Sequence, residues 1–204
     1  MIAGVILAGG LSRRMGGGDK CLLPLGGRPI LARVIERLAP QVDRLALNAN
    51  GDPARFAAFG LPVLADARGD FPGPLAGVLA GMDWAAAQGI GTIVTAAADT
   101  PFFPETLVAG LRAAAAREGA PLAVAVTDDA ERGLSPHPTF GLWDVALRED
   151  LRAAIEAGTR KVVAWTRPRG CAEALFAAPY EPFFNVNAPD DLRRAEAMLA
   201  EHAP

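Results

Sequence analysis

The first loop of the chain is rich in residue types that bind phosphate. Apolar residues 5–7 lead into Gly9 and Gly10, and Arg14 and Lys20 follow before the next apolar segment. Glycine lets the backbone approach a ligand closely, and arginine and lysine supply countercharge to phosphate oxygens. The loop therefore predicts a nucleotide site at the start of the fold. A basic surface turn is the structural alternative.

The same loop matches neither of two common nucleotide-binding motifs. Lys20 is preceded by Asp19 and followed by Cys21, so the G-x-x-x-x-G-K-[ST] pattern is not met. The G-x-G-x-x-G pattern is also missing after the first apolar run. A P-loop ATPase and a simple dinucleotide dehydrogenase are therefore disfavoured.

Two carboxylates follow short apolar runs. Asp99 comes directly after residues 93–98, and Asp66 comes after residues 63–65. A carboxylate at the end of a buried strand is well placed to hold Mg²⁺ against substrate phosphates. The alternatives are a helix-capping role for Asp99 and a turn role for Asp66.

Amides and small residues form two further candidate contacts. Asn185 and Asn187 flank Val186, and in a strand both amides would point to one side and could face a ligand. The structural alternative is a strand-to-helix turn with an asparagine cap. Residues 73–77 open a helix and include the small residues Gly73, Ala76 and Gly77, which would let a ligand lie against the helix N-terminus. On the sequence alone, tight helix–sheet packing is the favoured interpretation of these small residues.

The composition bounds the class of protein. The chain has 204 residues, 51% hydrophobic and 21% charged, which predicts a single domain over residues 1–204. The net charge of −3 provides no global basic field for nucleic acid.

We see no apolar stretch near the ~20 residues of a membrane span and no secretory signal, and we expect a cytoplasmic protein. Cys21 and Cys171 lack metal-site spacing, and only His137 and His202 are histidines, so a histidine metal site or Ser-His-Asp triad is disfavoured.

Strand and helix patterns alternate along the chain. We expect strands over residues 2–7, 44–48, 62–65, 92–97, 122–127, 139–143, 173–177 and 183–186. We expect helices from residue 29 to before Pro40 and over residues 74–88, 104–118, 145–157 and 189–201, with a polar loop over residues 128–138. This order predicts an α/β fold, with a Rossmann-like, mostly parallel sheet and helices on both faces. In such sheets ligands bind at the carboxyl ends of the strands, where the polar residues above collect.

These motifs together resemble the molybdenum cofactor guanylyltransferases. An aspartate before Lys20 and the second glycine at Gly10 are similar to this guanylyl-transferring branch, whereas the related cytidylyltransferases tend to have Ala-Ala-Gly and no such aspartate. The resemblance spans nearly the whole chain, in this order: Leu7-Ala8-Gly9-Gly10-x-Ser12-x-Arg14-Met15-Gly16, Asp19-Lys20, Leu25-x-Gly27-x-Pro29, Asn48-Ala49-Asn50, Asp66, Gly73-Pro74-Leu75-Ala76-Gly77, Asp99-Thr100-Pro101-Phe102, His137-Pro138 and Asn185-Val186-Asn187-x-Pro189.

The resemblance implies a nucleotidyltransferase (glycosyltransferase-A-like) architecture and transfer of GMP from GTP to the terminal phosphate of molybdopterin, with release of pyrophosphate. It implies catalytic roles for Arg14, Lys20 and Asp99, with Mg²⁺ on Asp99 and Asn187 as a further candidate ligand. The implied GTP-binding residues are Leu7, Ala8, Gly9, Gly10, Lys20, Asn48, Asp66 and Asp99, and the implied acceptor-binding residues are Gly77, Asn185 and Asn187.

The resemblance also implies partners. The family hands its product to molybdoenzymes and their chaperones, and for this chain we expect a monomer or weak oligomer that binds neither nucleic acid nor membrane. One alternative is a related nucleotidyltransferase that uses CTP, or that acts on a sugar phosphate or phospholactate. A second is a non-catalytic GTP-binding domain, which the joint presence of Arg14, Lys20 and Asp99 disfavours.

Overall fold

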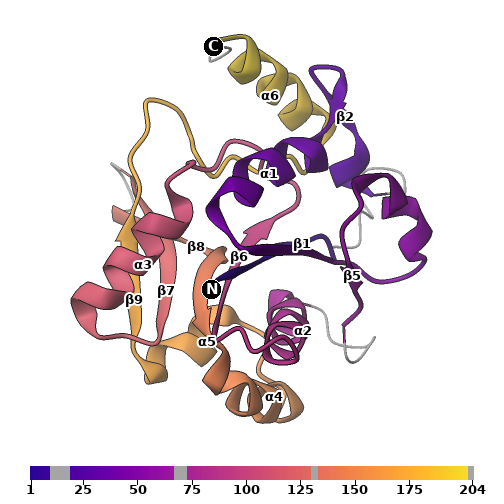
Figure 1. The fold of residues 1–204 in the computed structure, drawn as a ribbon. Coiled ribbons are helices and arrows are strands. Elements are labelled where there is room, and N and C mark those ends of the chain that lie inside the picture. Colours follow the sequence, from indigo (N-terminus) through magenta and orange to yellow (C-terminus); the bar gives the residue numbers. More distant parts are fainter. Residues whose placement is uncertain (10–18, 67–72, 130–132, 202–204) are drawn as a thin grey trace.

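The structure is a computed structural model that describes residues 1–9, 19–66, 73–129 and 133–201. In this part of the chain, a seven-stranded sheet forms the centre, with the strand order β5-β4-β1-β6-β8-β7-β9 (Figure 1). The strands are β1 (Ala3–Leu7), β4 (Arg44–Asn48), β5 (Val63–Leu64), β6 (Thr92–Ala97), β7 (Leu122–Asp129), β8 (Gly133–Asp144) and β9 (Cys171–Leu175).

The sheet is mostly parallel, as the alternating pattern predicted. Strands β5, β4, β1 and β6 run parallel to one another, and β9 runs parallel to β7. Only β8, among these strands of the described residues, is antiparallel to both of its neighbours, β6 and β7. The carboxyl ends of four adjacent strands therefore meet at one edge of the sheet.

Helices cover both faces of the sheet (Figure 1). Side chains alternate along each strand, so Ile6 packs into the core on one face and Val5 into the core on the other. The first core contains residues of α1 (Ile30–Leu38) and α3 (Leu107–Glu118). The second contains residues of α2 (Pro74–Ala86), α4 (Arg148–Glu156) and α5 (Val162–Thr166).

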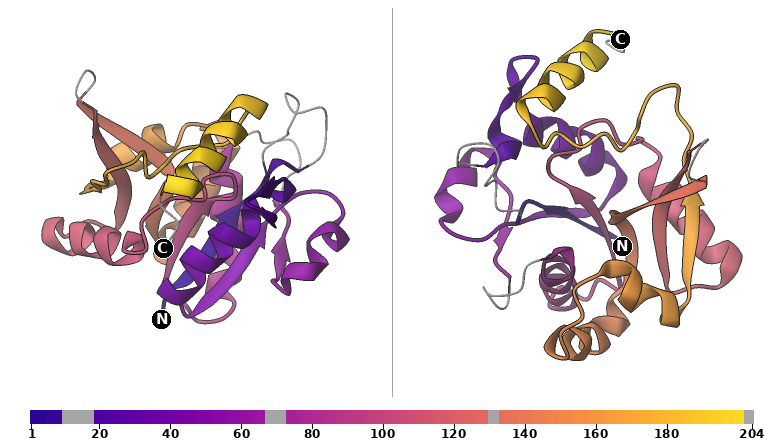
Figure 2. Two further views of the ribbon diagram at one scale, coloured as in Figure 1. Left: turned by 90° about the horizontal axis from the view of Figure 1, so that it is seen from above. Right: turned by 180° about the vertical axis from the view of Figure 1, so that it is seen from behind.

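A third, smaller core joins the end of the chain to its beginning. Helix α6 (Pro189–Glu201) lies beside the hairpin of β2 (Pro24–Leu25) and β3 (Arg28–Pro29) (Figures 1 and 2). The buried residues of this core are Leu25, Ile30, Phe102, Phe184, Val186 and Ala195. This packing holds the segment before α6 against the loop that follows β6.

Several expected elements differ from the structure. The polar loop predicted over residues 128–138 is wrong where the structure describes it, because residues 128–129 belong to β7 and residues 133–138 belong to β8, and the two strands pair as an antiparallel hairpin. Residues 130–132 lie outside the described residues. An antiparallel arm can leave one face in water, so it needs no continuous apolar run; Leu134 is 53% exposed.

The strand predicted over residues 183–186 is also wrong, because no ladder forms there in the described chain. Its apolar residues are instead buried one by one against the neighbouring cores. The single helix predicted over residues 145–157 is a short 3₁₀ turn, η5 (Val145–Leu147), followed by α4. Strand β9 begins two residues earlier than expected, and α5 was not expected.

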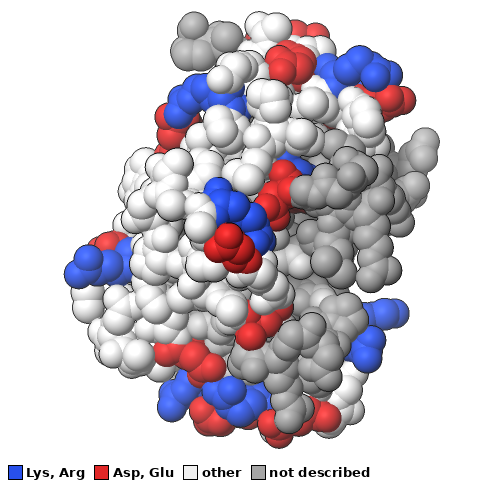
Figure 3. All heavy atoms as spheres, turned by 90° about the vertical axis from the view of Figure 1, so that its right-hand side faces the viewer, with Lys and Arg blue, Asp and Glu red and all other residues white. Residues whose placement is uncertain are grey.

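Charged side chains of both signs lie close together on the face shown in Figure 3. Lysine and arginine side chains form ion pairs with aspartate and glutamate side chains in the described structure, for example Arg152 with Asp83 at 2.7 Å. Among the helices that the structure describes, none is long and apolar enough to cross a membrane.

Candidate active site

The carboxyl ends of β4, β1 and β6 are locked together by backbone hydrogen bonds. Leu7 pairs in register with Asn48 on one side and with Ala97 on the other. Beyond the strands, the Ala8 N–H donates to the Asn48 carbonyl at 2.8 Å, and the Ala98 N–H donates to the Leu7 carbonyl at 3.0 Å. A pocket opens at this edge, and it is lined by Leu7, Ala8, Asp19, Lys20, Cys21, Ala98 and Asp99.

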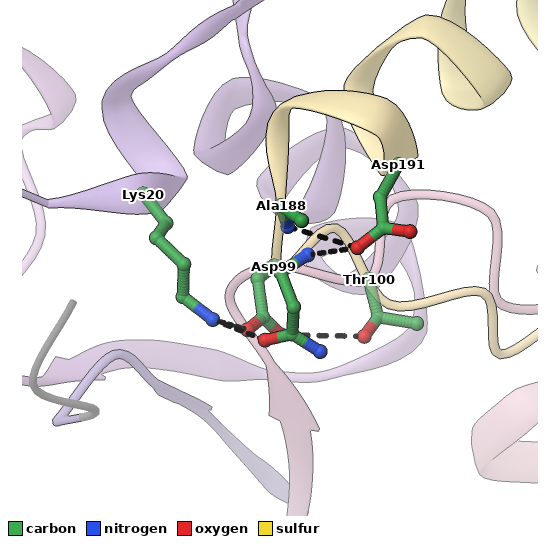
Figure 4. A network of polar contacts seen from close by, with 6 residues as sticks. Lys20, Asp99, Thr100, Ala188 and Asp191 are labelled. Carbon is green, nitrogen blue, oxygen red and sulfur yellow. Dashed lines mark hydrogen bonds and ion pairs between the residues drawn. The ribbon is translucent and has the colours of Figure 1, made fainter. Parts of the chain in front are cut away.

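Three predicted residues converge on one side of this pocket. The Lys20 ammonium lies 2.8 Å from Asp99 Oδ2 and donates to Asn187 Oδ1 at 2.5 Å. Lys20 and Asp99 retain 17% and 19% of their side-chain exposure, so the pair is reachable from solvent. The Thr100 hydroxyl donates to the other Asp99 oxygen at 3.4 Å (Figure 4). Asp99 and Asn187 lie 79 and 167 positions from Lys20 along the chain, and both contact its ammonium group.

The position of Asn187 is fixed by the start of α6. The backbone N–H groups of Asn187 and Ala188 both donate to Asp191 Oδ2 at 2.9 Å (Figure 4). Just before them, the Val186 N–H donates to the Asp99 carbonyl at 2.9 Å. Asn185 and Asn187 are exposed on either side of buried Val186, so the predicted alternation is present although the strand is not.

On the other side of the pocket, two amides hold a carboxylate. Asn48 is 2% exposed, and its Nδ2 donates to Asp66 Oδ1 at 2.9 Å and to the Leu64 carbonyl at 3.1 Å. Asn50 Nδ2 donates to Asp66 Oδ2 at 2.7 Å, and Asn50 Oδ1 accepts from the Asp66 N–H at 2.9 Å. Both carboxylate oxygens are thereby oriented.

Glycines allow these groups to pack closely. A Cβ on Gly77, in the first turns of α2, would lie 2.2 Å from Asn48 Oδ1 and 2.9 Å from a Leu7 methyl group. A Cβ on Gly9 would lie 3.6 Å from Asn48 Oδ1. The structure thus gives Gly77 the packing role that the sequence alone favoured, and its acceptor role stays a prediction.

Cys21 lines the pocket but is poorly suited to act as a nucleophile. Burial, followed by repulsion from the carboxylates of Asp19 and Asp99, raises the pKa of its thiol to about 12. The thiol therefore stays protonated at neutral pH. Cys171 is also a free cysteine, so neither is disulfide-bonded.

Two predicted residues, Gly10 and Arg14, lie outside the described residues. Within the described ranges, no cluster of three or more His, Cys, Asp or Glu side chains is placed to hold a metal ion. A candidate metal position here would have to rely on Asp99 with neutral oxygen donors.

Some residues of the site were missed by the sequence analysis. Asn50 was named but given no role in the site, and Arg55 and the cap formed by Asp191 were not assigned to the site at all. Asp191 stands three positions after Ala188, the residue before α6, and an acidic residue at this spacing is typical of a helix start and could have indicated the cap. No local signal indicated Arg55, because its partner Asp19 is 36 residues away.

This chain is similar in sequence to known proteins over nearly its whole length. A family model described as "MobA-like NTP transferase domain" matches residues 4–173. A molybdenum cofactor guanylyltransferase from Nitrobacter hamburgensis is 52% identical over 201 residues, which cover 97% of this chain and 94% of that protein. The chain belongs to the molybdenum cofactor guanylyltransferase family. Another member of this family, from Cereibacter sphaeroides, is 53% identical and is covered over 98% of both chains.

Solved structures support the fold of this guanylyltransferase family member. Molybdopterin-guanine dinucleotide biosynthesis protein A from Archaeoglobus fulgidus aligns with a TM-score of 0.76 and 24% identity, over 98% of this chain and all of that one. A 4-diphosphocytidyl-2C-methyl-D-erythritol synthase from Anaerococcus prevotii aligns with the same TM-score and 12% identity, over 98% of this chain and 96% of that one. The expected nucleotidyltransferase architecture is confirmed.

Proposed function

We propose that this chain transfers GMP from GTP to the terminal phosphate of molybdopterin and releases pyrophosphate. The observation that carries the proposal is the convergence of Lys20, Asp99 and Asn187 at the carboxyl edge of the sheet, beside the pocket that follows β1. The names of its close relatives support the choice of guanylyl donor and molybdopterin acceptor.

The proposed reaction does not require the protein to remove a proton from the acceptor. A phosphate monoester has a second pKa near 6, so the terminal phosphate of the acceptor is already largely ionised at neutral pH. The task of the site is to bring two polyanions together and to stabilise the charge that develops on the leaving pyrophosphate. A lysine flanked by an amide and a carboxylate suits this task better than a histidine would.

The residues present fit Mg²⁺. Asp99 offers a carboxylate and Asn187 an amide oxygen, and both oxygens already contact the same cation, Lys20 Nζ. Magnesium takes one or two protein oxygens, keeps several waters and binds substrate phosphates, so it needs no larger acidic cluster. When bound, the ion would supply positive charge that offsets the negative charge of the substrate phosphates. We assign Asp99 as its ligand and Asn187 as a second candidate.

Each remaining group has a role in this proposal. Lys20, together with Arg14 of the glycine-rich loop, would hold the triphosphate and the departing pyrophosphate. Leu7, Ala8, Gly9 and Gly10 would line the nucleotide. Asn48 would orient Asp66, whose carboxylate is suited to accept from guanine N1–H or the 2-amino group. Gly77, Asn185 and Asn187 would face the acceptor.

The deciding experiment incubates the purified chain with GTP, Mg²⁺ and molybdopterin and follows both pyrophosphate and the guanine dinucleotide. Competition by ATP, CTP and UTP tests the choice of base. We expect stoichiometric formation of both products and selection of GTP. Nucleotide binding without pyrophosphate release would overturn the transferase proposal, and preferred use of CTP would overturn the base assignment.

A further inference from the structure

Arg55 connects two parts of the site that are distant in sequence. It lies in the 3₁₀ segment η4 (Pro53–Phe59), and its Nε is 2.5 Å from Asp19 Oδ2. Nε lacks an aligned hydrogen-bond acceptor among the described residues, so this contact is an ion pair rather than a directed hydrogen bond. The two terminal nitrogens donate to the carbonyl oxygens of Asp52 at 2.9 Å and Asn50 at 2.5 Å.

The backbone before η4 is shaped around this guanidinium. Gly51 has a φ of +85°, which favours glycine, and a Cβ there would lie 3.0 Å from Arg55 Nη1. Asp52 then accepts from the Ala54 N–H at 2.9 Å and caps η4. The carbonyls of residues 50 and 52 therefore face one cation across a turn that a larger residue would disturb.

Hydrogen bonds connect Arg55, through Asn50, to Asp66, the residue proposed to contact the base. Asn50 accepts from Arg55 through its backbone carbonyl, and its side-chain amide makes two hydrogen bonds with Asp66, at 2.7 and 2.9 Å. A continuous polar path thus runs from Asp19 through Arg55 and Asn50 to Asp66. Its first member follows the glycine-rich loop directly, and its last lies beyond β5.

Charge gives Arg55 a second effect. Asp19 lines the same pocket as Lys20, yet this pocket is proposed to receive a triphosphate. An uncompensated carboxylate there would repel the phosphates, and at 20% exposure it is only partly screened by solvent. The Arg55 guanidinium balances this charge without taking Lys20 away from the phosphates.

We propose that Arg55 is a positioning residue for purine nucleoside triphosphate binding. It neutralises Asp19 beside the phosphates, and through Asn50 it fixes Asp66 beside the base. The nature of the ligand rests on the proposed function. The proposal predicts that the phosphate effect and the base effect can be separated by mutation.

The test measures binding by calorimetry with Mg²⁺ and without molybdopterin, using GTP and inosine triphosphate, which lacks only the 2-amino group. The variants are Arg55→Gln, Arg55→Lys, and Asp19→Asn combined with Arg55→Gln. Asp66→Asn sets the size of the base effect. Arg28→Gln is the matched control, since Arg28 pairs with Glu36 at 2.6 Å and both side chains are about half exposed.

Arg55→Gln should weaken GTP binding about tenfold and lower the preference for GTP over inosine triphosphate, as Asp66→Asn does. Arg55→Lys keeps the charge but lacks the planar fork that serves two carbonyls. It should bind GTP within about threefold of the wild-type affinity but keep the lowered preference. The double variant removes the repelling carboxylate and should show the same pattern. Arg28→Gln should bind as the wild type does.

Wild-type binding by Arg55→Gln would overturn the inference, as would an unchanged GTP preference in Asp66→Asn. Equal losses in all three Arg55 variants would also overturn it, because a merely structural role predicts no recovery. Thermal unfolding of each variant without nucleotide shows whether a loss of binding comes from a loss of stability. These outcomes are distinct from failure of the proposed function, in which the wild-type chain binds GTP but releases no pyrophosphate with molybdopterin.

Discussion

At the scale of single residues, Lys20 and Asp99 neutralise each other in the described structure at 2.8 Å. Polyphosphate and Mg²⁺ would each compete for one member of this pair. Lys20 would hold the triphosphate and Asp99 would hold the metal, so binding of both would replace the ion pair with two new sets of contacts. This exchange predicts that the two side chains have different kinetic roles.

Replacing Asp99 with alanine should abolish Mg²⁺-dependent transfer and leave the fold intact. A metal ion supplies several kcal/mol of charge stabilisation, so we expect the turnover number to fall at least about a hundredfold. The measurement is pyrophosphate release with GTP and molybdopterin, with circular dichroism as the check on folding. Glu36→Ala, which removes a surface carboxylate paired with Arg28, is the control. Near-normal turnover by the Asp99 variant would remove the metal role.

Replacing Lys20 with alanine should mainly raise the GTP requirement. The variant loses the cation that we assign to the triphosphate, and it also leaves Asp99 and Asn187 without their shared ammonium donor. We expect KM for GTP to rise about tenfold or more, which corresponds to one charge-assisted contact. Lys161→Ala, at an exposed position outside the candidate site, should titrate as the wild type does. An unchanged GTP titration for Lys20→Ala would mean that Lys20 is only a surface charge.

At the scale of elements, α2 and the end of β4 approach each other more closely than any side chain on Gly77 permits. Gly77→Ala should lower the free energy of unfolding by about 1–3 kcal/mol, because its Cβ would lie 2.2 Å from Asn48 Oδ1. A gain of up to about 1 kcal/mol in helix propensity offsets part of this loss, so the net change stays destabilising. Urea unfolding measures it. Gly91→Ala is the control, since its Cβ meets nothing within 4 Å. A Gly77 variant as stable as the wild type would contradict this packing role.

The same elements explain how far the sequence could predict the site. Apolar runs that end in polar residues predicted which strand ends carry Asn48, Asp66 and Asp99, because parallel strands bring their carboxyl ends to one edge. The contact of Asn187 with Lys20 was not predictable, because it depends on how α6 packs over the β2–β3 hairpin. Arg55 was missed for the same reason: its role arises from long-range pairing, which local patterns do not encode.

The hydrophobic periodicity of the sequence does not predict the full hairpin of β7 and β8. Its outer half is polar and contains two prolines, which are typical of loops rather than of paired strands. The ladder shifts register between Val124 and Ala125, and the pairing then resumes with His137. A hairpin of this kind is stabilised by its partner strand and by aromatic packing, neither of which is visible in a window of neighbouring residues.

At the scale of the whole molecule, His137 links this hairpin to the segment before α6. Its ring stacks on Phe183 with centroids 4.4 Å apart, and its Nε2 is 2.8 Å from the Thr127 hydroxyl. Burial lowers the pKa of His137 below the usual 6.5, because the charged ring would lose its hydration. The histidine therefore favours the folded state only while it is neutral.

This direction predicts how stability depends on pH. The pKa is lower in the folded than in the unfolded chain, so His137 contributes its full stability above the unfolded value of about 6.5 and loses it as the pH falls through the folded value. Between about pH 7.5 and 5, most carboxylates stay ionised, and the wild-type free energy of unfolding should fall with a slope of at most about 1.4 kcal/mol per pH unit from this group. His137→Gln should flatten that slope in urea unfolding, whereas His202→Gln retains the titrating His137 and should follow the wild type. If His137→Gln and the wild type lose stability in parallel, another group controls the acid limb and the stack on Phe183 does not couple the hairpin to pH.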